Sequence, residues 1–211
     1  MEHPEPRPAV ELVSRTVRQP NPLDVTSASS ALVQGSTIDG VQLRALQPAR
    51  DERGSFTEMF AQHWDCGVEP VQWSIVQSQP GVFRGMHLHQ RHDEYVAIVS
   101  GRMFVGLHDL RPSSPTFRVA SLYHLTADDP AFIALPRGLL HGWLFPEPTV
   151  HLQAVSEAYT TYGADDNHGC HWSDPALGID WPFAPSIVSA RAEGFGSVDG
   201  LLERVRQRSR T

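Results

Sequence analysis

The sequence predicts an all-β protein, an antiparallel sandwich or barrel with jelly rolls among the options, together with a flexible N-terminal arm and a short C-terminal helix. Short strand-like runs follow one another from about residue 36, and turn signals such as QPG, SGR, RPSSP and LPRG separate them. Regularly spaced short strands of this kind are typical of antiparallel sandwiches and barrels. The expected strands are GVQLRALQ, GSFTEMFA, VQWSIVQSQ, DEYVAIVSG, RMFVGLHDL, FRVASLYHL, AFIALP, GWLFPE and VHLQAVSEAY.

The chain divides into three expected parts. Residues 1–35 are rich in Pro, Ser and Arg, which predicts a partly disordered arm. Residues 36–195 hold all the expected strands and form the domain. In residues 196–211, the segment GSVDGLLERVRQRS begins with Ser and Asp and then places apolar residues at helical spacing. These last residues are therefore expected to form the C-terminal helix.

Composition excludes several classes of protein. Apolar residues make up 40% of the 211 residues, as expected of a globular domain. The net charge is −7 and no basic cluster occurs, so nucleic acid is not an expected partner. No apolar run is long enough to span a membrane, and the N-terminus lacks the apolar core of a signal peptide. With two cysteines in no CxxC pattern, a cytoplasmic protein without a membrane partner is expected.

Residues 81–101, GVFRGMHLHQRHDEYVAIVSG, crowd three histidines and two acids beside an apolar run. His87 and His89 are two residues apart, so their side chains point the same way on a strand. Glu94 lies an odd number of residues from His89. The polar segment between them must therefore bend to bring the carboxylate to the same point.

Together with His141 of PRGLLH, this stretch resembles the two signature motifs of the cupin superfamily, small jelly-roll barrels. The resemblance implies that one divalent metal ion is bound by four ligands: His87, His89, Glu94 and His141. Imidazole and carboxylate accept Fe, Ni, Mn, Co or Zn, so the identity of the metal stays open. His92 and Asp93 are expected to be turn residues.

Six motifs in order carry a more particular resemblance. They are DERGSFTEMF, VQWSIVQSQPGVFRGMH, DLRPSSPTF, LPRGLLHGW, a Tyr pair spaced Y-x2-Y, and WSDPALGIDWPF. Together they resemble the dTDP-4-dehydrorhamnose 3,5-epimerase family over about residues 38–192. That family implies a homodimeric jelly roll that binds a nucleotide-linked sugar and removes a proton beside the sugar ketone.

The resemblance also implies roles for individual residues. Five would bind the substrate, its phosphates included: Arg53, Gln72, Arg84, His141 and Tyr159. Two would act in catalysis, His87 as the general base and Tyr162, and Glu94 is expected to act beside them in place of the family Lys. If His87 binds the metal, it cannot also take the proton, and the base would be a metal-bound hydroxide or another residue. Guanidinium suits a diphosphate because it donates two hydrogen bonds at once.

Three positions depart from the family pattern. The family Lys that steadies the enolate falls on Glu94, the Tyr that returns the proton on Ser156, and the Asp that pairs with the base on Ala192. Each such loss typically costs a factor of roughly 10² or more. A carboxylate in place of a cation makes sense if a divalent ion supplies the positive charge. We therefore expect a metal-assisted epimerase or isomerase of a dTDP-type 4-keto-6-deoxy sugar.

Two other readings stay open. One is a metal-dependent cupin of different chemistry, such as an Fe(II) oxygenase, a lyase or a decarboxylase, acting on a natural product. The other is a relative that binds its ligand without catalysis. Binding of a dTDP sugar would separate the epimerase from the first of these alternatives.

Overall fold

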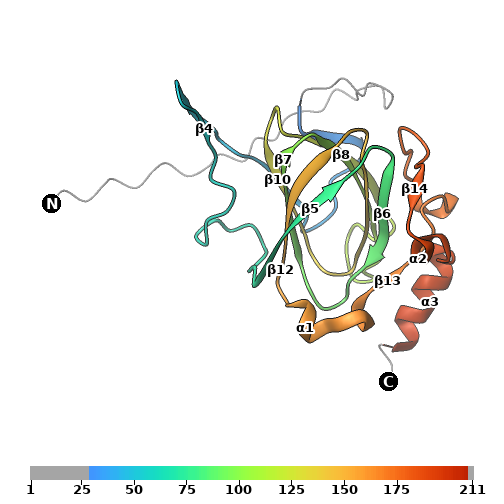
Figure 1. Ribbon diagram of the computed structural model, residues 1–211. Coiled ribbons are helices and arrows are strands. Elements are labelled where there is room, and N and C mark those ends of the chain that lie inside the picture. Colours follow the sequence, from blue (N-terminus) through green and yellow to red (C-terminus); the bar gives the residue numbers. More distant parts are fainter. Residues whose placement is uncertain (1–28, 209–211) are drawn as a thin grey trace.

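The computed structural model describes residues 29–208, which form two facing sheets that close into a barrel (Figure 1). The first sheet contains β1 (Ala31–Gly35), β6 (Val82–Leu88), β8 (Arg102–Asp109), β9 (Ala120–Thr126), β11 (Leu139–Leu144), β13 (His168–Gly169) and β14 (Ile187–Val188). The second contains β2 (Gln42–Ala45), β5 (Gln72–Ser78), β7 (Glu94–Ser100), β10 (Ala131–Leu135) and β12 (Thr149–Val155). The expected all-β jelly roll is confirmed.

Smaller elements surround the barrel. A separate ribbon pairs β3 (Ala49–Asp51) with β4 (Gly54–Phe56) and projects away from the body (Figure 1). The helices are α1 (Tyr159–Tyr162), α2 (Ala190–Glu193) and α3 (Val198–Arg208), with 3-10 turns η1 (Gly163–Asp166) and η2 (Pro175–Leu177). No helix within residues 29–208 is long and apolar enough to cross a membrane.

The strand order is β1-β9-β8-β11-β6-β13 in the first sheet and β2-β10-β7-β12-β5 in the second. The main core lies between the sheets and includes Ile98, Val105, Ile133 and Trp143. A second apolar layer joins the first sheet to α3 through Leu201. Both faces of that sheet are therefore covered, which is why strands such as β8 and β11 carry apolar residues almost continuously.

The structured part of the chain begins earlier than residue 36. Most of the expected arm, residues 1–28, lies outside the described residues. Residues 31–35 are not part of an arm, because they form β1 and pair with β9. The expected strand GSFTEMFA is also shorter, since only residues 54–56 are extended and paired. The C-terminal helix is confirmed as α3.

Neighbouring strands from both sheets position the candidate site. β6 pairs with β11 in the first sheet, where His87 lies opposite His141. β7 pairs with β12 in the second sheet. Residues 89–93 cross from one sheet to the other, so the bend expected in this segment is confirmed.

One glycine allows β6 and β11 to approach closely. Gly85 has a φ of +135°, and a Cβ there would lie 2.6 Å from the Gly142 Cα and 2.8 Å from the His141 carbonyl oxygen. Only glycine fits such a position. It lies between Arg84 and His87, two of the expected site residues.

Candidate functional site

Imidazole and carboxylate groups gather where β6, β7 and β11 meet the segment after α1. The members of this cluster are His87, His89, His92, Glu94, His141 and Asp166. One ring nitrogen from each of His87, His89 and His141 lies within 4.8 Å of the others. The expected convergence of these three side chains is therefore confirmed.

Glu94 is the centre of the cluster and is 3% exposed. Its Oε2 lies 3.2 Å from His141 Nε2, and its Oε1 accepts a 3.0 Å hydrogen bond from Gln153 Nε2. Burial raises the pKa of this carboxyl, but the imidazoles of His141, His92 and His89 outweigh burial and hold the pKa below its usual range. Glu94 is therefore a buried carboxylate.

His92 supplies the positive charge that balances Glu94. Its buried ring lies between two carboxylates, with Nδ1 3.2 Å from Asp166 Oδ2 and Nε2 3.7 Å from Glu94 Oε1. Burial opposes the charged form, yet both carboxylates outweigh it and raise the pKa of His92 to about 9. His92 is thus an imidazolium at neutral pH and not a mere turn residue.

Asp166 fastens the crossover segment to the chain that follows α1. Its carboxylate accepts hydrogen bonds from the backbone N–H groups of Gln90 and Arg91, at 2.8 and 3.0 Å. Its carbonyl oxygen accepts from His89 Nδ1 at 2.7 Å. This last bond leaves Nε2 of His89 facing the cluster.

His87 and His141 are the two neutral bases. Burial first, and then the neighbouring histidines, lower the pKa of His87 to about 3. Burial also lowers the pKa of His141 to about 4, although Glu94 opposes this shift. Among the described residues, none hydrogen-bonds to the half-buried ring of His87. His87 therefore offers a free lone pair throughout the physiological pH range.

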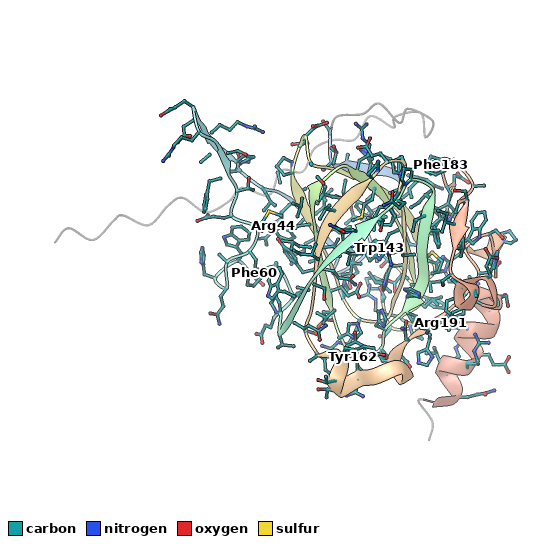
Figure 2. The ribbon with its side chains drawn as sticks, in the orientation of Figure 1. Arg44, Phe60, Trp143, Tyr162, Phe183 and Arg191 are labelled. Atoms are coloured by element: carbon teal, nitrogen blue, oxygen red, sulfur yellow. The ribbon has the colours of Figure 1, made fainter. Side chains whose placement is uncertain are left out.

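Tyr162 closes one end of this arrangement. Its ring stacks on His92 with centroids 4.2 Å apart. Figure 2 places Tyr162 on α1 at the end of the barrel, whereas Trp143 lies inside it. Burial raises the pKa of the Tyr162 hydroxyl, so the phenol stays protonated at neutral pH. The structure thus brings all three expected catalytic residues together.

The expected substrate-binding residues fall into two groups. Arg84 is held by hydrogen bonds from Nε to Ser78 Oγ (2.9 Å) and from Nη2 to the Gln77 carbonyl (3.1 Å). Gln72 Oε1 accepts from the backbone N–H of Tyr159, at 2.9 Å. Arg53 lies apart, on the projecting ribbon of β3 and β4, where it pairs with Asp51. A single chain therefore does not bring Arg53 to the cluster.

A hollow of about 800 Å³ adjoins the crossover segment outside the cluster. Two arginines line it, but each is already paired, Arg91 with Glu157 and Arg137 with Asp93. Their charges are therefore balanced within the chain. None of the cluster histidines lines this hollow, so we do not assign the chemistry to it.

The structure shows where two of the positions that depart from the family pattern, Ser156 and Ala192, lie relative to the cluster. Ser156 does not face the cluster, because its Oγ accepts from the backbone N–H of Asp93 (2.9 Å). The β12 residue beside Glu94 is Gln153, three positions earlier. Ala192 is buried on α2, next to β6, and offers no polar group to His87. The whole sequence also contains no lysine.

Sequence reasoning missed three functional candidates: His92, Gln153 and Asp166. His92 lies in a polar turn, which hid its role. Gln153 could have been found as an amide within a strand of mostly apolar residues. Nothing in the local sequence could have paired Asp166 with residues 76 positions away.

The comparisons with known proteins decide the family. The profile of the dTDP-4-dehydrorhamnose 3,5-epimerase family matches residues 35–198. The chain belongs to this family. It is 32% identical over 183 residues to dTDP-4-dehydrorhamnose 3,5-epimerase of Streptomyces griseus, covering 81% of this chain and 87% of that one.

Solved structures agree with the family. An epimerase of Mycobacterium tuberculosis superimposes with a TM-score of 0.71 at 28% identity, covering 83% of this chain and 92% of that one. An epimerase of Legionella pneumophila, solved with dTDP-4-keto-L-rhamnose, gives 0.71 at 25% identity, covering 80% and 94%. The chain is thus a carbohydrate epimerase of the nucleotide-sugar type.

The prediction of a divalent metal cofactor is wrong. The dTDP-sugar epimerases of this family work without a metal. The prediction arose because Glu94, in place of a cation, required a positive charge nearby. The structure supplies that charge from the chain itself, as the imidazolium of His92. The alternative predictions of a metal-dependent oxygenase, lyase or decarboxylase required this metal and are therefore wrong as well.

Proposed function

We propose that this protein epimerises a carbon next to the ketone of a dTDP-linked 4-keto-6-deoxy sugar. The observation that carries the proposal is the neutral ring of His87, free of hydrogen bonds from the described residues and beside the Glu94–His141 pair. A proton next to a ketone is acidic, and a positioned imidazole can remove it. The Legionella pneumophila relative solved with dTDP-4-keto-L-rhamnose supports this class of substrate.

The reaction moves one proton and leaves the formula of the sugar unchanged. His87 takes the proton from the carbon, and the electron pair forms an enolate with the ketone. A proton returned to the opposite face of that carbon inverts its configuration. A dianionic diphosphate beside His87 would raise its pKa from about 3 and make it a stronger base in the complex.

Tyr162 is our candidate for the proton donor. Of the four tyrosines, Tyr95 and Tyr123 are buried in apolar clusters, which leaves Tyr159 and Tyr162 near the site. Tyr162 is protonated at neutral pH and stacks on the imidazolium of His92. Since the chain has no lysine, we assign stabilisation of the enolate to imidazole N–H groups of the cluster.

Glu94 and His141 would hold the abstracted proton between the two halves of the reaction. Both nitrogens of His141 face acceptors, the Glu94 carboxylate at 3.2 Å and the Leu139 carbonyl at 3.1 Å. Only protonated imidazole donates from both nitrogens. A proton that reaches His141 would therefore complete two hydrogen bonds.

Arg84 would bind the diphosphate, and Arg53 would reach the site from a second copy of the chain. Arg53 projects from its own body on the ribbon of β3 and β4. The edge strand β5 exposes Ile75 at 69%, and Val71 just before it at 63%. An apolar edge of this kind supports pairing with another copy, so we propose a homodimer. The free Cys66 and Cys170 support a cytoplasmic location.

Deuterium exchange tests the proposed reaction. The purified protein is incubated with dTDP-4-keto-6-deoxyglucose in D2O, and NMR follows deuterium at the two carbons that flank the ketone. We expect exchange in the wild type and a loss of at least about 10²-fold in His87→Asn. Calorimetry with dTDP provides the control, since the His87→Asn substitution should leave nucleotide affinity intact. Exchange that persists in this variant would exclude His87 as the base.

The dimer has its own test. Light scattering should give twice the chain mass for the wild type, and Ile75→Arg should shift the mass toward the monomer. Arg53→Ala should weaken dTDP binding while leaving the mass unchanged. A wild-type monomer with full exchange activity would refute the dimer.

A further inference from the structure

His151 is a buried histidine that the proposed chemistry does not use. It lies in the middle of β12 and is 0% exposed. Neither ring nitrogen has a hydrogen-bond partner within residues 29–208. Leaving two buried polar atoms unpaired costs stability, and an apolar ring of similar size would avoid that cost. A buried histidine with two unpaired ring nitrogens therefore suggests a hydrogen-bonding ligand that comes from outside the chain.

The His151 ring faces the space between the two sheets. Two residues along β12 point to the same face of a strand, so His151 shares its face with Gln153, which donates to Glu94. Phe145, which follows β11 of the opposite sheet, stacks on the ring with centroids 5.7 Å apart and an interplanar angle of 12°. His151 therefore lies roughly 7 Å along the strand from Gln153, at about 3.3 Å per residue.

Charges of two proposed site residues also act on the His151 ring. The charges that act on His151 are those of Arg84 and Glu94. Arg84 is the candidate for the diphosphate, and Glu94 belongs to the proton-transfer cluster. A sugar joined to a diphosphate at Arg84, with its reacting carbon at His87, would pass next to His151.

The charge state of His151 selects the chemistry of its partner. Burial, followed by Arg84, lowers the pKa of His151 to about 4, so the ring is neutral at physiological pH. A neutral imidazole has one N–H donor and one lone-pair acceptor. An anion would meet only one useful nitrogen, whereas a sugar hydroxyl both donates and accepts.

We propose that His151 determines sugar specificity by hydrogen-bonding a ring hydroxyl of the nucleotide-linked sugar. This inference rests on the proposed function for the position of the sugar. It adds a contact to the hexose itself, distinct from the nucleotide, the diphosphate and the proton-transfer groups.

The test compares two ligands by calorimetry, dTDP and the unreactive dTDP-glucose. We expect the wild type to bind dTDP-glucose more tightly than dTDP. His151→Phe should keep the stacking on Phe145 and lose about tenfold in affinity for dTDP-glucose, the worth of one hydrogen bond. Its affinity for dTDP should remain within about twofold. Its Tm should equal or exceed that of the wild type, because two unpaired polar atoms are removed.

His124→Phe provides the matched control. His124 is also a buried histidine with an unpaired Nε2 and an aromatic neighbour, Phe104 at 5.1 Å. Phe104 belongs to the outer apolar layer near α3 and not to the space between the sheets. This variant should bind both ligands like the wild type.

Three results would overturn the inference. Equal wild-type affinity for dTDP and dTDP-glucose would mean that the hexose gains no net contact in the site. An unchanged affinity for dTDP-glucose in His151→Phe would remove the contact. An equal loss for both ligands would assign His151 a structural role. None of these measurements needs turnover, so they separate this inference from the deuterium-exchange test of the function.

Discussion

The buried charge of His92 predicts a pH-dependent stability that can be measured directly. The two carboxylates raise the pKa of His92 from 6.5 to about 9. At 1.36 kcal/mol for each pKa unit, this shift corresponds to about 3 kcal/mol of stability in the folded state. Because the folded pKa is raised, the contribution is complete below pH 6.5 and is lost as the pH rises through 9. The carboxylates of Glu94 and Asp166 stay ionised across this window, since both pKa values are lowered.

Urea unfolding of the wild type and His92→Gln across pH 6 to 10 tests this reasoning. We expect the variant to be about 3 kcal/mol less stable at pH 6, and the difference to shrink steadily toward pH 10. The urea dependence of the free energy of unfolding should be the same for both proteins, so that midpoints can be compared. A constant difference at every pH would mean that His92 acts through packing on Tyr162 and not through its charge.

Three further outcomes are expected. Gly85→Ala should lower the free energy of unfolding by about 2 kcal/mol or more, because its Cβ would lie 2.6 Å from the Gly142 Cα. Thermal unfolding would measure this loss of stability, and dTDP calorimetry would detect any displacement of Arg84. EDTA should leave the rate of deuterium exchange unchanged, and a rate restored only by added metal would contradict the role given to His92. Ala192→Asp should place a carboxylate near His87, raise the pKa of His87 and increase the rate of deuterium exchange. An unchanged NMR titration of the His87 ring would show that the two side chains do not contact each other.

The sequence was sufficient to predict the barrel because its signals were local. Short apolar runs separated by Gly, Pro and Asp marked nine of the strands, but none of the expected runs matched β1, β3, β6, β13 or β14. The spacing of His87 and His89 correctly predicted that their rings converge, although His89 lies one residue beyond β6. The start of the domain was harder to locate. The Ala-Leu-Val run of β1 is short and follows a Ser-rich stretch, and its partner β9 lies about 90 residues away.

The charge balance of the site could not be predicted in the same way. The positive charge on His92 depends on Asp166, which approaches it only after the chain has completed β12 and turned through α1 and η1. From spacing alone, an imidazole beside two acids favours a metal site as readily as an ion pair. The two differ in how the groups are paired in space, and pairing is a tertiary property.

The absence of lysine has a consequence for the chemistry of a ketone in this barrel. Positive charges near the site are carried by guanidinium and imidazolium groups, among them Arg84, Arg191 and His92. None of these is a primary amine, so none can condense with a keto group to form an imine. Whichever ketone enters therefore meets cations that can attract it but cannot capture it covalently. Sodium borohydride, which traps imines irreversibly, should leave no sugar attached to the site.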